Sequence, residues 1–494
     1  MNVKPNRVGE FPFRKSDPEE RKKNFSEVQQ PYSEIEVMAE AERCLLCGTP
    51  VCIDACPVLL DVRGMNEAVA RGDFKTAHDR IRETNPLIGV TARCCPQLQG
   101  LCEDACVMRW SGQPVGIGLI QRFVADWERK NRQPDPEVSP DTGKKVAIIG
   151  SGPSGLAAAE LLRRYGHAVT VFEEMDAPGG TAWYGIPDYH LPKDVLKHEI
   201  ERIKGMGVQI STGVKIGGDK MPLASIQEDY DAVLITTGAK DPTRLKTPGI
   251  GLRGVCSGYD FLQTVFGNGL ENYLKNPSFD LGKEIIVVGG GDSSLDCART
   301  ALRLTGGTVT LTYRRSENDM PADPVMLDEA KEEGVNFRFL VEPKAYEGSD
   351  GKLTFAVFDT MQLSEPDESG RRSPEPVAGK EFRIACSTVL LAVGRGPNSL
   401  LQKQTGLKMG PRNSIAVNEF FETSMKGVFS AGDVTSGETL VVRAMGSGRE
   451  AAQRVHEYLM NLRDQHVSFY ERYYNQNLYD RMLDGSVSHE IPPD

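Results

Sequence analysis

The spacing of hydrophobic residues divides the chain into two unlike parts. In the first part, apolar side chains recur at helical intervals, as in the stretches 65–85 and 118–130, which predicts amphipathic helices. From Val146 onward, short runs of consecutive apolar residues alternate with glycine turns and helical segments. That texture is typical of parallel strands joined by helices. The segment 131–145 is polar, contains three prolines and is predicted to be a linker.

Two strand–turn–helix–strand units are recognisable in the second part, at residues 145–174 and 283–315. Two further apolar strands, within 231–239 and 387–395, each run into a glycine. A chain of 494 residues is too long for a single core, so several domains are expected. The pattern predicts an α/β protein in which a mainly helical N-terminal domain precedes two Rossmann-like dinucleotide-binding domains.

Composition and charge exclude several classes of protein. The formal net charge of −11 argues against broad binding of nucleic acid backbones. No apolar run has the length of a membrane-spanning helix, and the charged N-terminus lacks the apolar stretch of a secretory signal. We therefore expect a cytoplasmic protein with reduced thiols that binds neither nucleic acid nor membrane.

The first strand–turn–helix–strand unit carries a dinucleotide-binding fingerprint. Gly150, Gly152 and Gly155 form G-x-G-x-x-G between a strand and the start of a helix. These glycines permit a tight turn, a close approach of backbone to pyrophosphate, and close packing of helix on strand. The next strand ends at Glu173, whose carboxylate can accept hydrogen bonds from ribose hydroxyls. An α/β turn without a nucleotide is the less favoured alternative.

The occupant of this first site is predicted from a later stretch. A strand ends in Ala431-Gly432-Asp433, and a helical segment follows shortly after it. An aspartate in that position can hold the ribityl chain of a flavin whose ADP half lies on the first unit. The sequence therefore predicts FAD at the first site.

The second unit predicts a nicotinamide nucleotide. Gly289, Gly291 and Ser294 follow its first strand, so that serine replaces the third glycine of the fingerprint. Its second strand ends in Arg314 and Arg315, where a site for NADH would carry an acid. A guanidinium matches the charge and geometry of a 2′-phosphate, so NADPH is favoured over NADH. A solvated basic strand end is the alternative.

Eight of the eleven cysteines lie between Cys44 and Cys106. The first four are Cys44, Cys47, Cys52 and Cys56, and they are followed by proline in a run that resembles that of bacterial ferredoxins. In such runs the fourth cysteine ligates a second cluster. The second group of four consists of Cys94, Cys95, Cys102 and Cys106. Iron–sulfur clusters are favoured here, with a zinc site as the main alternative.

The predicted sites for NADPH, flavin and iron–sulfur clusters together indicate a chain of electron transfer. NADPH supplies two electrons together, an iron–sulfur cluster accepts one at a time, and a flavin can do both. No Ser/His/Asp arrangement or paired carboxylates are recognisable in the sequence. We therefore expect an oxidoreductase in which the cofactors carry the chemistry, and we expect no catalytic acid, base or nucleophile.

A set of motifs gives the chain a family resemblance. These motifs are RCLLCGTPVCIDACP (43–57), GSGPSGLAAA, PGGTAWYGIPDYHLPK (178–193), GGGDSSLDCA, YRRSENDMPA and AGDV. With them the chain resembles the small (beta) subunit of glutamate synthase. It is equally similar to the module shared by dihydropyrimidine dehydrogenase and the bifurcating NADH-dependent ferredoxin:NADP oxidoreductase.

The resemblance implies two 4Fe–4S clusters with interlaced ligands. The ligands of one would be Cys44, Cys47, Cys52 and Cys106. The ligands of the other would be Cys56, Cys95, Cys102 and the non-cysteine residue Gln121. Because Cys94 and Cys95 are adjacent, the sequence leaves open which of them is the ligand.

The resemblance also implies an NADPH domain inserted into a split FAD domain, with Gly179 and Gly180 near the flavin. The predicted divisions are a helical domain with two clusters, the first part of the FAD domain, the NAD(P)H domain, the second part of the FAD domain, and a C-terminal tail. Their bounds are 1–142, 143–250, 251–399, 400–465 and 466–494.

The partner is the open question. Glutamate synthase needs an amidotransferase with an N-terminal cysteine, whereas this chain begins with Met-Asn-Val. We therefore expect an electron-input subunit in a hetero-oligomer with a larger catalytic subunit that makes glutamate from glutamine and 2-oxoglutarate. The same module serving another partner, such as dihydropyrimidine dehydrogenase, a bifurcating transhydrogenase or an aldehyde-oxidising metalloenzyme, is the alternative. A scaffold with degenerate sites is disfavoured, because none of the expected cofactor residues is missing.

Overall fold

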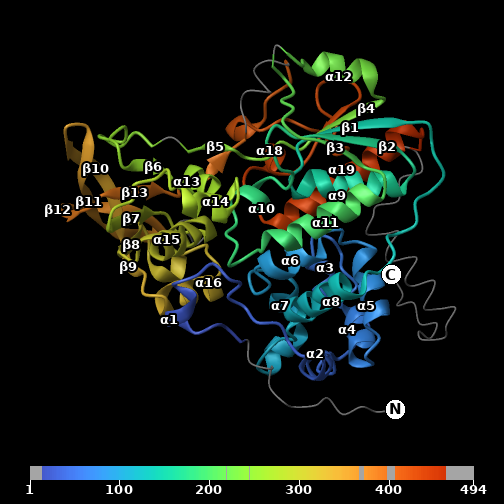
Figure 1. Cartoon of the computed structure of the whole chain (residues 1–494), viewed down its shortest axis with the longest axis horizontal. Coiled ribbons are helices and arrows are strands. Elements are labelled where there is room, and N and C mark those ends of the chain that lie inside the picture. The colour runs from blue at the N-terminus through green and yellow to red at the C-terminus, as the bar shows by residue number, and fades with distance from the viewer. Residues whose placement is uncertain (1–13, 219, 244, 367–371, 398–405, 463–494) are drawn as a thin grey trace.

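The computed structural model describes residues 14–218, 220–243, 245–366, 372–397 and 406–462. A helical domain lies beside two sheet domains, and a narrow antiparallel arm extends from the second of these (Figure 1). The predicted C-terminal tail, 466–494, lies outside the described residues. None of the described helices is long and apolar enough to cross a membrane.

The helical domain is built from short helices with side-chain caps. Ser33 and Glu36 form a capping box, and Asp61 and Asp73 each accept a hydrogen bond from the first turn of the helix that follows. The core of the domain contains Met65 and Val69, which are fully buried. The helices are α2 (Glu34–Ala41), α3 (Val51–Asp54), α4 (Val62–Ala70), α5 (Phe74–Arg82), α6 (Ile88–Cys94), α7 (Cys102–Ala105), η1 (Val107–Ser111) and α8 (Ile117–Asn131).

The first sheet domain contains a five-stranded parallel sheet in the order β15-β4-β1-β2-β3. Its strands are β1 (Lys145–Ile149), β2 (Ala168–Phe172), β3 (Gln209–Ser211), β4 (Ala232–Ile235) and β15 (Val428–Ser430). Its helices are α9 (Pro153–Arg164), α10 (Thr181–Tyr184), α11 (Lys193–Gly205), α12 (Leu223–Asp229), α18 (Asp433–Ser436) and α19 (Val441–Leu459), with η3 (Pro411–Asn413). Strands β4 and β15 are neighbours although the second sheet separates them in sequence, so the predicted split arrangement is confirmed.

The second sheet domain repeats the same plan. Its parallel sheet has the order β6-β13-β7-β8-β9. The strands are β6 (Val255–Ser257), β7 (Glu284–Val288), β8 (Thr308–Tyr313), β9 (Asn336–Phe339) and β13 (Thr388–Leu391). The helices are α13 (Gly258–Phe266), α14 (Leu270–Lys275), α15 (Asp292–Thr305) and α16 (Pro324–Glu332), with η2 (Glu317–Asp319). The short strands β5 (Asp241–Pro242) and β14 (Arg395–Gly396) pair where the chain passes between the two domains.

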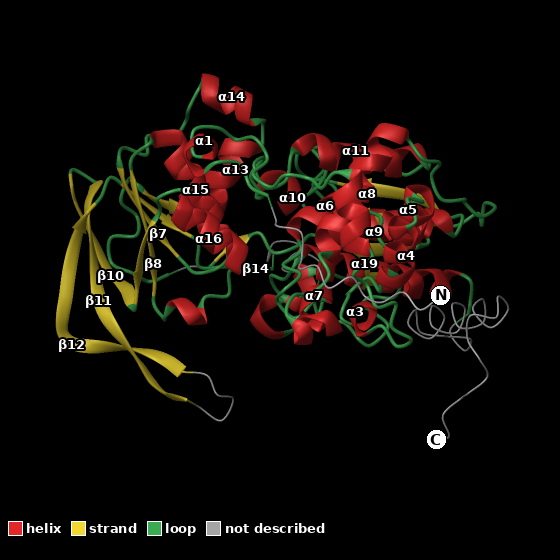
Figure 2. Cartoon of the chain, turned by 90° about the horizontal axis from the view of Figure 1, so that it is seen from below, coloured by secondary structure: helices red, strands yellow, loops and turns green. Residues whose placement is uncertain are grey.

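An antiparallel arm, which the sequence analysis did not predict, extends from the second sheet domain. It consists of β10 (Val341–Ser349), β11 (Lys352–Pro366) and β12 (Arg372–Ala385), and it projects from the body in Figure 2. Pro374 and Pro376 lie in the outer strand β12. Proline and charged side chains on an edge strand discourage pairing with further strands.

The N-terminal segment joins the domains. Helix α1 (Pro18–Arg21) places Arg21 in a buried ion pair with Glu333, which also pairs with Arg299 and Arg303 of α15. Further along, Glu27 pairs with Arg93 of the helical domain. The segment therefore spans from the second sheet domain to the helical domain. The linker predicted at 131–145 is irregular from residue 132 to 144, whereas Asn131 ends α8 and Lys145 begins β1.

Candidate cofactor sites

The first glycine loop connects β1 to α9 and can be formed only by small residues. Gly150 has a φ of +104°, and a Cβ there would lie 2.6 Å from the carbonyl oxygen of Thr236. A Cβ on Gly155 would lie 2.0 Å from the carbonyl oxygen of Gly150. At Gly152, the N-cap of α9, an added Cβ meets no atom within 4 Å. Open space at the start of this helix suits a phosphate group, because backbone N–H groups and the helix dipole point into it.

Glu173 lies directly after β2, buried beside this loop. One carboxylate oxygen accepts hydrogen bonds from the backbone N–H of Ser151 at 3.0 Å and from its hydroxyl at 2.5 Å. The other accepts from the N–H of Met175 at 2.9 Å. In the structure the carboxylate thus fixes the glycine loop, and its contact with a ribose stays a prediction.

Gly179 and Gly180 lie on top of the same loop. Their φ angles are +127° and +55°. The N–H of Gly179 donates to the carbonyl oxygen of Ser151 at 3.1 Å, and a Cβ on Gly180 would lie 2.8 Å from the Cα of Gly152. The structure therefore brings these two glycines to the first dinucleotide loop, where they were expected.

Gly432 and Asp433 complete this site from the far end of the chain. A Cβ on Gly432 would lie 2.9 Å from the side chain of Ser154, at the start of α9. Three buried oxygens here have no hydrogen-bond partner among the described residues: Ser154 Oγ, Thr237 Oγ1 and Asp433 Oδ1. Burial raises the pKa of Asp433 to about 7, although Arg395 opposes this shift. Unpartnered buried oxygens around an open glycine loop fit a bound group that offers hydroxyls, such as FAD.

The second glycine loop has the same construction. Gly289 has a φ of +152°, and a Cβ there would lie 2.2 Å from the carbonyl oxygen of Ala392. Gly291 is open, with no atom within 4 Å of an added Cβ. Ser294 is fully buried, and its hydroxyl donates to the carbonyl oxygen of Gly291 at 2.6 Å. The serine that replaces the third glycine thus stabilises the loop through this hydrogen bond.

Arg314 and Arg315 follow β8, beside this second loop. Arg314 has a side chain that is 54% exposed and lies 3.4 Å from Glu342. Arg315 is largely buried, pairs with Asp319 at 3.0 Å, and has an Nε with no hydrogen-bond partner among the described residues. Both guanidinium groups therefore remain able to donate to a phosphate.

Four of the cysteines line one apolar cavity in the helical domain. These four are Cys44, Cys47, Cys52 and Cys106, and Val62 and Ile117 are among the apolar residues around them. Burial and the neighbouring thiols together raise the pKa of Cys52 to about 12. We call these four cysteines the outer thiol group.

A second set consists of three cysteines, of which Cys56 and Cys102 are buried and Cys95 is half-buried. Burial raises the pKa of Cys95 and of Cys102 well above the usual value, and the neighbouring thiol of Cys56 raises both pKa values further. Helix α3, which contains Cys52, packs against α7, which begins at Cys102, so the two sets are adjacent. We call Cys56, Cys95 and Cys102 the inner thiol group.

The spacing of the thiols bears on the choice between zinc and clusters. Over the described ranges, no three His, Cys, Asp or Glu side chains converge closely enough for a single metal ion. A cubane cluster spreads four thiolates over four iron atoms, whereas zinc gathers its ligands around one ion. A 4Fe–4S cluster takes four thiolate ligands, which is the number of cysteines in the outer thiol group.

Gln121 and Glu103 are buried oxygen-bearing side chains in the same domain as the inner thiol group. Gln121 is buried on α8, which packs against α6 and α7. Glu103 was not singled out from the sequence, yet its charge raises the pKa of both Cys95 and Cys102. Its carboxylate accepts a hydrogen bond from the N–H of Gly118 at 2.8 Å. The position of Glu103 directly after Cys102 was the available signal in the sequence.

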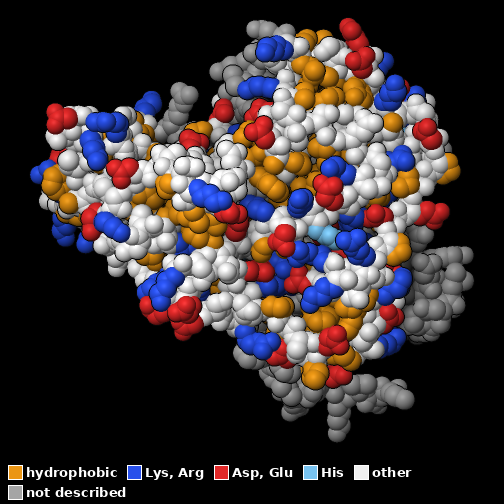
Figure 3. All heavy atoms as spheres, viewed as in Figure 1, with side chains coloured by type: hydrophobic (Ala, Val, Ile, Leu, Met, Phe, Trp, Pro, Cys, Tyr) orange, Lys and Arg blue, Asp and Glu red, His pale blue; other side chains and the backbone are white. Residues whose placement is uncertain are grey.

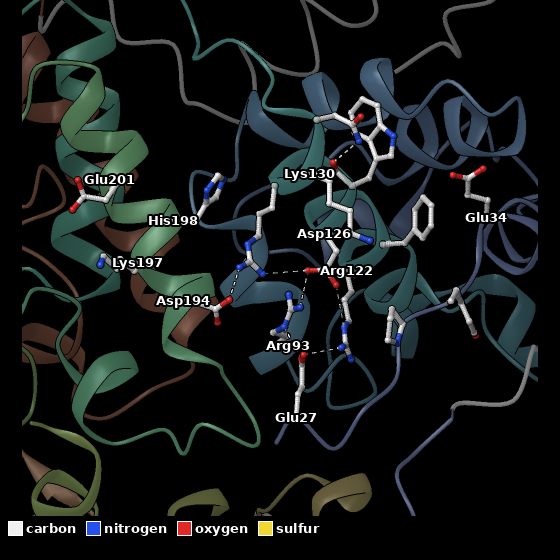
Figure 4. A pocket seen from close by; sticks show the side chains of 16 residues that line it. Glu27, Glu34, Arg93, Arg122, Asp126, Lys130, Asp194, Lys197, His198 and Glu201 are labelled. Carbon is white, nitrogen blue, oxygen red and sulfur yellow. Dashed lines mark hydrogen bonds and ion pairs between the residues drawn. The ribbon is translucent and has the colours of Figure 1, made fainter. Parts of the chain in front are cut away.

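A separate cavity of about 880 Å³ lies between α8, α11 and the N-terminal segment (Figure 4). Five Lys or Arg side chains, one His and five Asp or Glu side chains line it, and Figure 3 shows such charges gathered over this junction. Arg93 pairs with Glu27 and Asp126, and Arg129 pairs with Asp194 at 2.6 Å. These ion pairs join the helical domain to the N-terminal segment and to the first sheet domain.

Two family models match the chain. Residues 144–448 match pyridine nucleotide-disulphide oxidoreductase. Residues 21–133 match dihydropyrimidine dehydrogenase domain II, 4Fe-4S cluster. The boundary between the two matches falls in the irregular segment that separates the helical domain from the first sheet domain.

Curated relatives cover nearly the whole chain. The chain is 35% identical to the glutamate synthase [NADPH] small chain of Halomonas elongata, over 90% of this chain and 96% of that one. It is also 35% identical to the small chain of Escherichia coli, over 89% and 95% of the two chains. It is 37% identical to the NADP(+)-dependent formate dehydrogenase subunit beta of Moorella thermoacetica over 83% of this chain, but spans only 60% of that relative.

Solved structures share the arrangement of the two sheet domains. FprA of Mycobacterium tuberculosis in complex with NADPH superimposes with a TM-score of 0.56 at 20% identity, over 66% of this chain and 86% of that one. A likeness at this level of identity establishes the fold of the two sheet domains.

Proposed function

We propose a specific electron path for this chain, which belongs to the pyridine nucleotide-disulphide oxidoreductases and to the group of glutamate synthase small chains. The chain is thus an NAD(P)H-dependent FAD oxidoreductase with a 4Fe–4S domain. Electrons enter from NADPH at the second sheet domain and pass to FAD in the first. They leave through two 4Fe–4S clusters in the helical domain to a larger catalytic subunit. FAD, when bound, supplies the conversion of a two-electron donor into single electrons.

Residues of the first sheet domain would bind two parts of FAD, the pyrophosphate and the ribityl chain. Gly150, Gly152 and Gly155 leave room for the pyrophosphate at the start of α9. Asp433, with its unpartnered Oδ1, would accept a hydrogen bond from a hydroxyl of the ribityl chain. Glu173 holds the glycine loop in place through Ser151. We expect loss of either carboxylate to weaken flavin binding.

The second sheet domain would bind NADPH through two features. Gly289, Gly291 and Ser294 form the loop for the pyrophosphate. Arg314 and Arg315 would donate to the 2′-phosphate, which NADH lacks. The exposure of Arg314 and the unpartnered Nε of Arg315 support this assignment.

The two thiol groups would hold the two clusters. The outer thiol group would supply all four ligands of one cluster. The inner thiol group would supply three ligands of the other, with Gln121 as the fourth by family resemblance. Backbone N–H groups from Val58 to Leu60 point at Cys56 and favour its thiolate against burial. Such hydrogen bonds tune the potential of a cluster.

One contact carries the proposed order of the path. The carbonyl oxygen of Pro57 lies 2.3 Å from where a Cβ on Gly446 would stand, so α19 of the first sheet domain rests directly on the residue after Cys56. The inner thiol group is thus next to the flavin-binding domain, and the outer group lies beyond it, adjacent through the packing of α3 against α7. Its members Cys44, Cys47 and Cys52 are partly exposed.

The proposed partner is the large chain of glutamate synthase, which makes glutamate from glutamine and 2-oxoglutarate. The observation that favours it is length, because the chain covers 95% and 96% of two such small chains. The alternative is that another enzyme receives the electrons, as the similarity to a formate dehydrogenase subunit suggests. The chain spans only 60% of that subunit. We place the complex in the cytoplasm, where cysteine ligands stay reduced.

Reconstitution tests this role. The chain is purified with a glutamate synthase large chain from the same source and supplied with NADPH, glutamine and 2-oxoglutarate. The proposal expects glutamate formation that needs both chains, and expects none when the large chain is replaced by buffer. If the full mixture oxidised NADPH without forming glutamate, this partner would be rejected. The electron path within the chain has a separate test, the absorption spectra of its flavin and clusters during reduction by NADPH.

A further inference from the structure

Exposed large hydrophobic side chains concentrate at the outer thiol group. Among the described residues, the large apolar side chains with substantial exposure are Ile35, Leu45, Val51, Leu98, Val107, Trp110, Leu274, Met409 and Met460. Three of these line the cavity of the outer thiol group: Leu45, Val51 and Val107. Single exposed apolar residues are ordinary, whereas several around one cavity indicate a binding surface.

Trp110 extends this surface. It lies in the 3-10 helix η1, three residues after Val107, and residues three apart share one face of such a helix. Its side chain is 92% exposed, the largest exposure among these residues. Tryptophan contributes more binding free energy at protein interfaces than most other residue types. We call Leu45, Val51, Val107 and Trp110 the apolar patch.

The segments that form the apolar patch contain few charged residues. Residues 44–53 contain no Asp, Glu, Lys or Arg, and neither do residues 105–108. Of the charged residues around them, Arg63 lines the cavity, Asp54 ends α3, and Arg109 forms an ion pair with Asp104. Depletion of charged residues is typical of the centre of a protein–protein interface and not of its rim. Val51 lies on α3, and Val107 and Trp110 lie on η1, which follows α7 directly. Helices α3 and α7 pack together at one edge of the molecule (Figure 2).

We infer that the apolar patch is the docking surface for the larger catalytic subunit and the point where electrons leave the chain. This inference rests on the proposed function and adds the location of the partner. The patch surrounds the four thiols at the outer end of the path, so a protein seated on it would bring its own electron carrier closest to them. The partner is therefore a protein whose electron carrier lies beneath a mainly apolar surface.

Footprinting of the purified complex tests the location. The tagged chain is isolated with its large subunit, and hydroxyl-radical oxidation of Trp110 is compared between the complex and the isolated full-length chain. We expect Trp110 to be oxidised readily in the isolated chain and to be protected in the complex. Leu274 of α14, which is 51% exposed on the second sheet domain, is the reference and should react equally in both.

Variants test the contribution to affinity. Trp110→Ala should raise the dissociation constant of the complex by roughly 30-fold, the range of an interface hot spot. Trp110→Phe should restore part of the affinity, and Leu274→Ala should leave it unchanged. Iron content and visible absorption of each variant check that the helical domain is intact.

The outcomes separate this inference from the proposed function. A bound large subunit with Trp110 still reactive and Trp110→Ala still tightly bound would overturn the docking surface alone. Protection of Trp110 in the isolated chain would overturn it too, because another segment of this chain would then cover the patch. A chain that purifies with no large subunit at all would contradict the proposed function and the docking surface together.

Discussion

Cys94 and Cys95 are neighbours in the chain but lie in different surroundings: Cys94 lies near Lys193 and Asp296, whereas Cys95 lies near Cys56. Helix α6 ends at Cys94, and Cys95 takes an extended conformation, so the two side chains diverge. Only Cys95 therefore joins the inner thiol group.

Two serine variants test this difference. Cys95→Ser should lower the iron content by about four atoms per chain, the content of one 4Fe–4S cluster. Cys94→Ser is the matched control and should keep the iron of the wild type. Iron analysis and visible absorption of the purified variants provide the measurement. Equal iron loss in both variants would contradict the assignment of Cys95 alone as the ligand. Iron loss only in Cys94→Ser would reverse that assignment.

Gly446→Ala tests the contact between α19 and the loop after Cys56. A methyl group here would meet the carbonyl oxygen of Pro57, so helix and loop must move apart. We expect a loss of about 1–3 kcal/mol in the free energy of unfolding, the usual effect of overpacking. After anaerobic mixing with NADPH, the flavin should be reduced as fast as in the wild type and the clusters more slowly.

Gly251→Ala is the control for Gly446→Ala, because an added Cβ there meets no atom within 4 Å. It should change neither stability nor cluster reduction. If Gly446→Ala reduced its clusters at the wild-type rate, electrons would not cross at this contact.

Arg314→Ala and Arg315→Ala test the choice of nucleotide. Each removes a charged donor to the 2′-phosphate, and we expect the KM for NADPH to rise roughly 10- to 100-fold. The KM for NADH should change little. Arg383→Ala, which alters an exposed arginine of β12 paired with Glu347, is the control. Equal effects on both nucleotides would show that these arginines do not read the 2′-phosphate.

Asp433 predicts a pH dependence of the flavin-free protein. Its pKa is raised in the folded state to about 7 from the ordinary 3.8 because the group is buried. Because the folded state binds this proton more tightly than the unfolded state, the protonated carboxyl contributes to the free energy of unfolding. This contribution is complete below about pH 3.8 and is lost as the pH rises through about 7. The flavin-free chain should therefore be less stable at pH 8 than at pH 5, by roughly 2–3 kcal/mol from this group.

Urea unfolding at the two pH values measures this effect. Asp433→Asn has no group to titrate there, so its stability should fall less between pH 5 and pH 8 than that of the wild type. The same variant should retain less FAD after purification. An identical pH dependence in the two proteins would contradict the assignment.

The sequence predicted the parts of the structure that local patterns determine. The glycine loops at Gly150 and Gly289 were recognisable because a tight turn between strand and helix requires glycine at fixed intervals. The helices within 65–85 and 118–130 of the N-terminal domain followed from apolar periodicity. In both cases the determining interactions lie within a few residues of one another.

The features that the sequence did not reveal depend on distant contacts. Strand β12 is polar and contains two prolines, so only its pairing with β11 makes it a strand. The anchoring of α1 relies on the ion pair of Arg21 with Glu333, more than three hundred residues away. The choice between Cys94 and Cys95 depends on where α6 ends, and helix ends are poorly determined by periodicity.

The central claim is that electrons from NADPH reach two clusters within this chain. Anaerobic titration of the purified chain with NADPH, followed by visible absorption and combined with iron and flavin analysis, tests it most directly. We expect one FAD and about eight iron atoms per chain, with bleaching of the flavin bands and of the iron–sulfur absorption as NADPH is added. A chain whose flavin is reduced by NADPH while its iron–sulfur absorption is absent or unchanged would contradict the account.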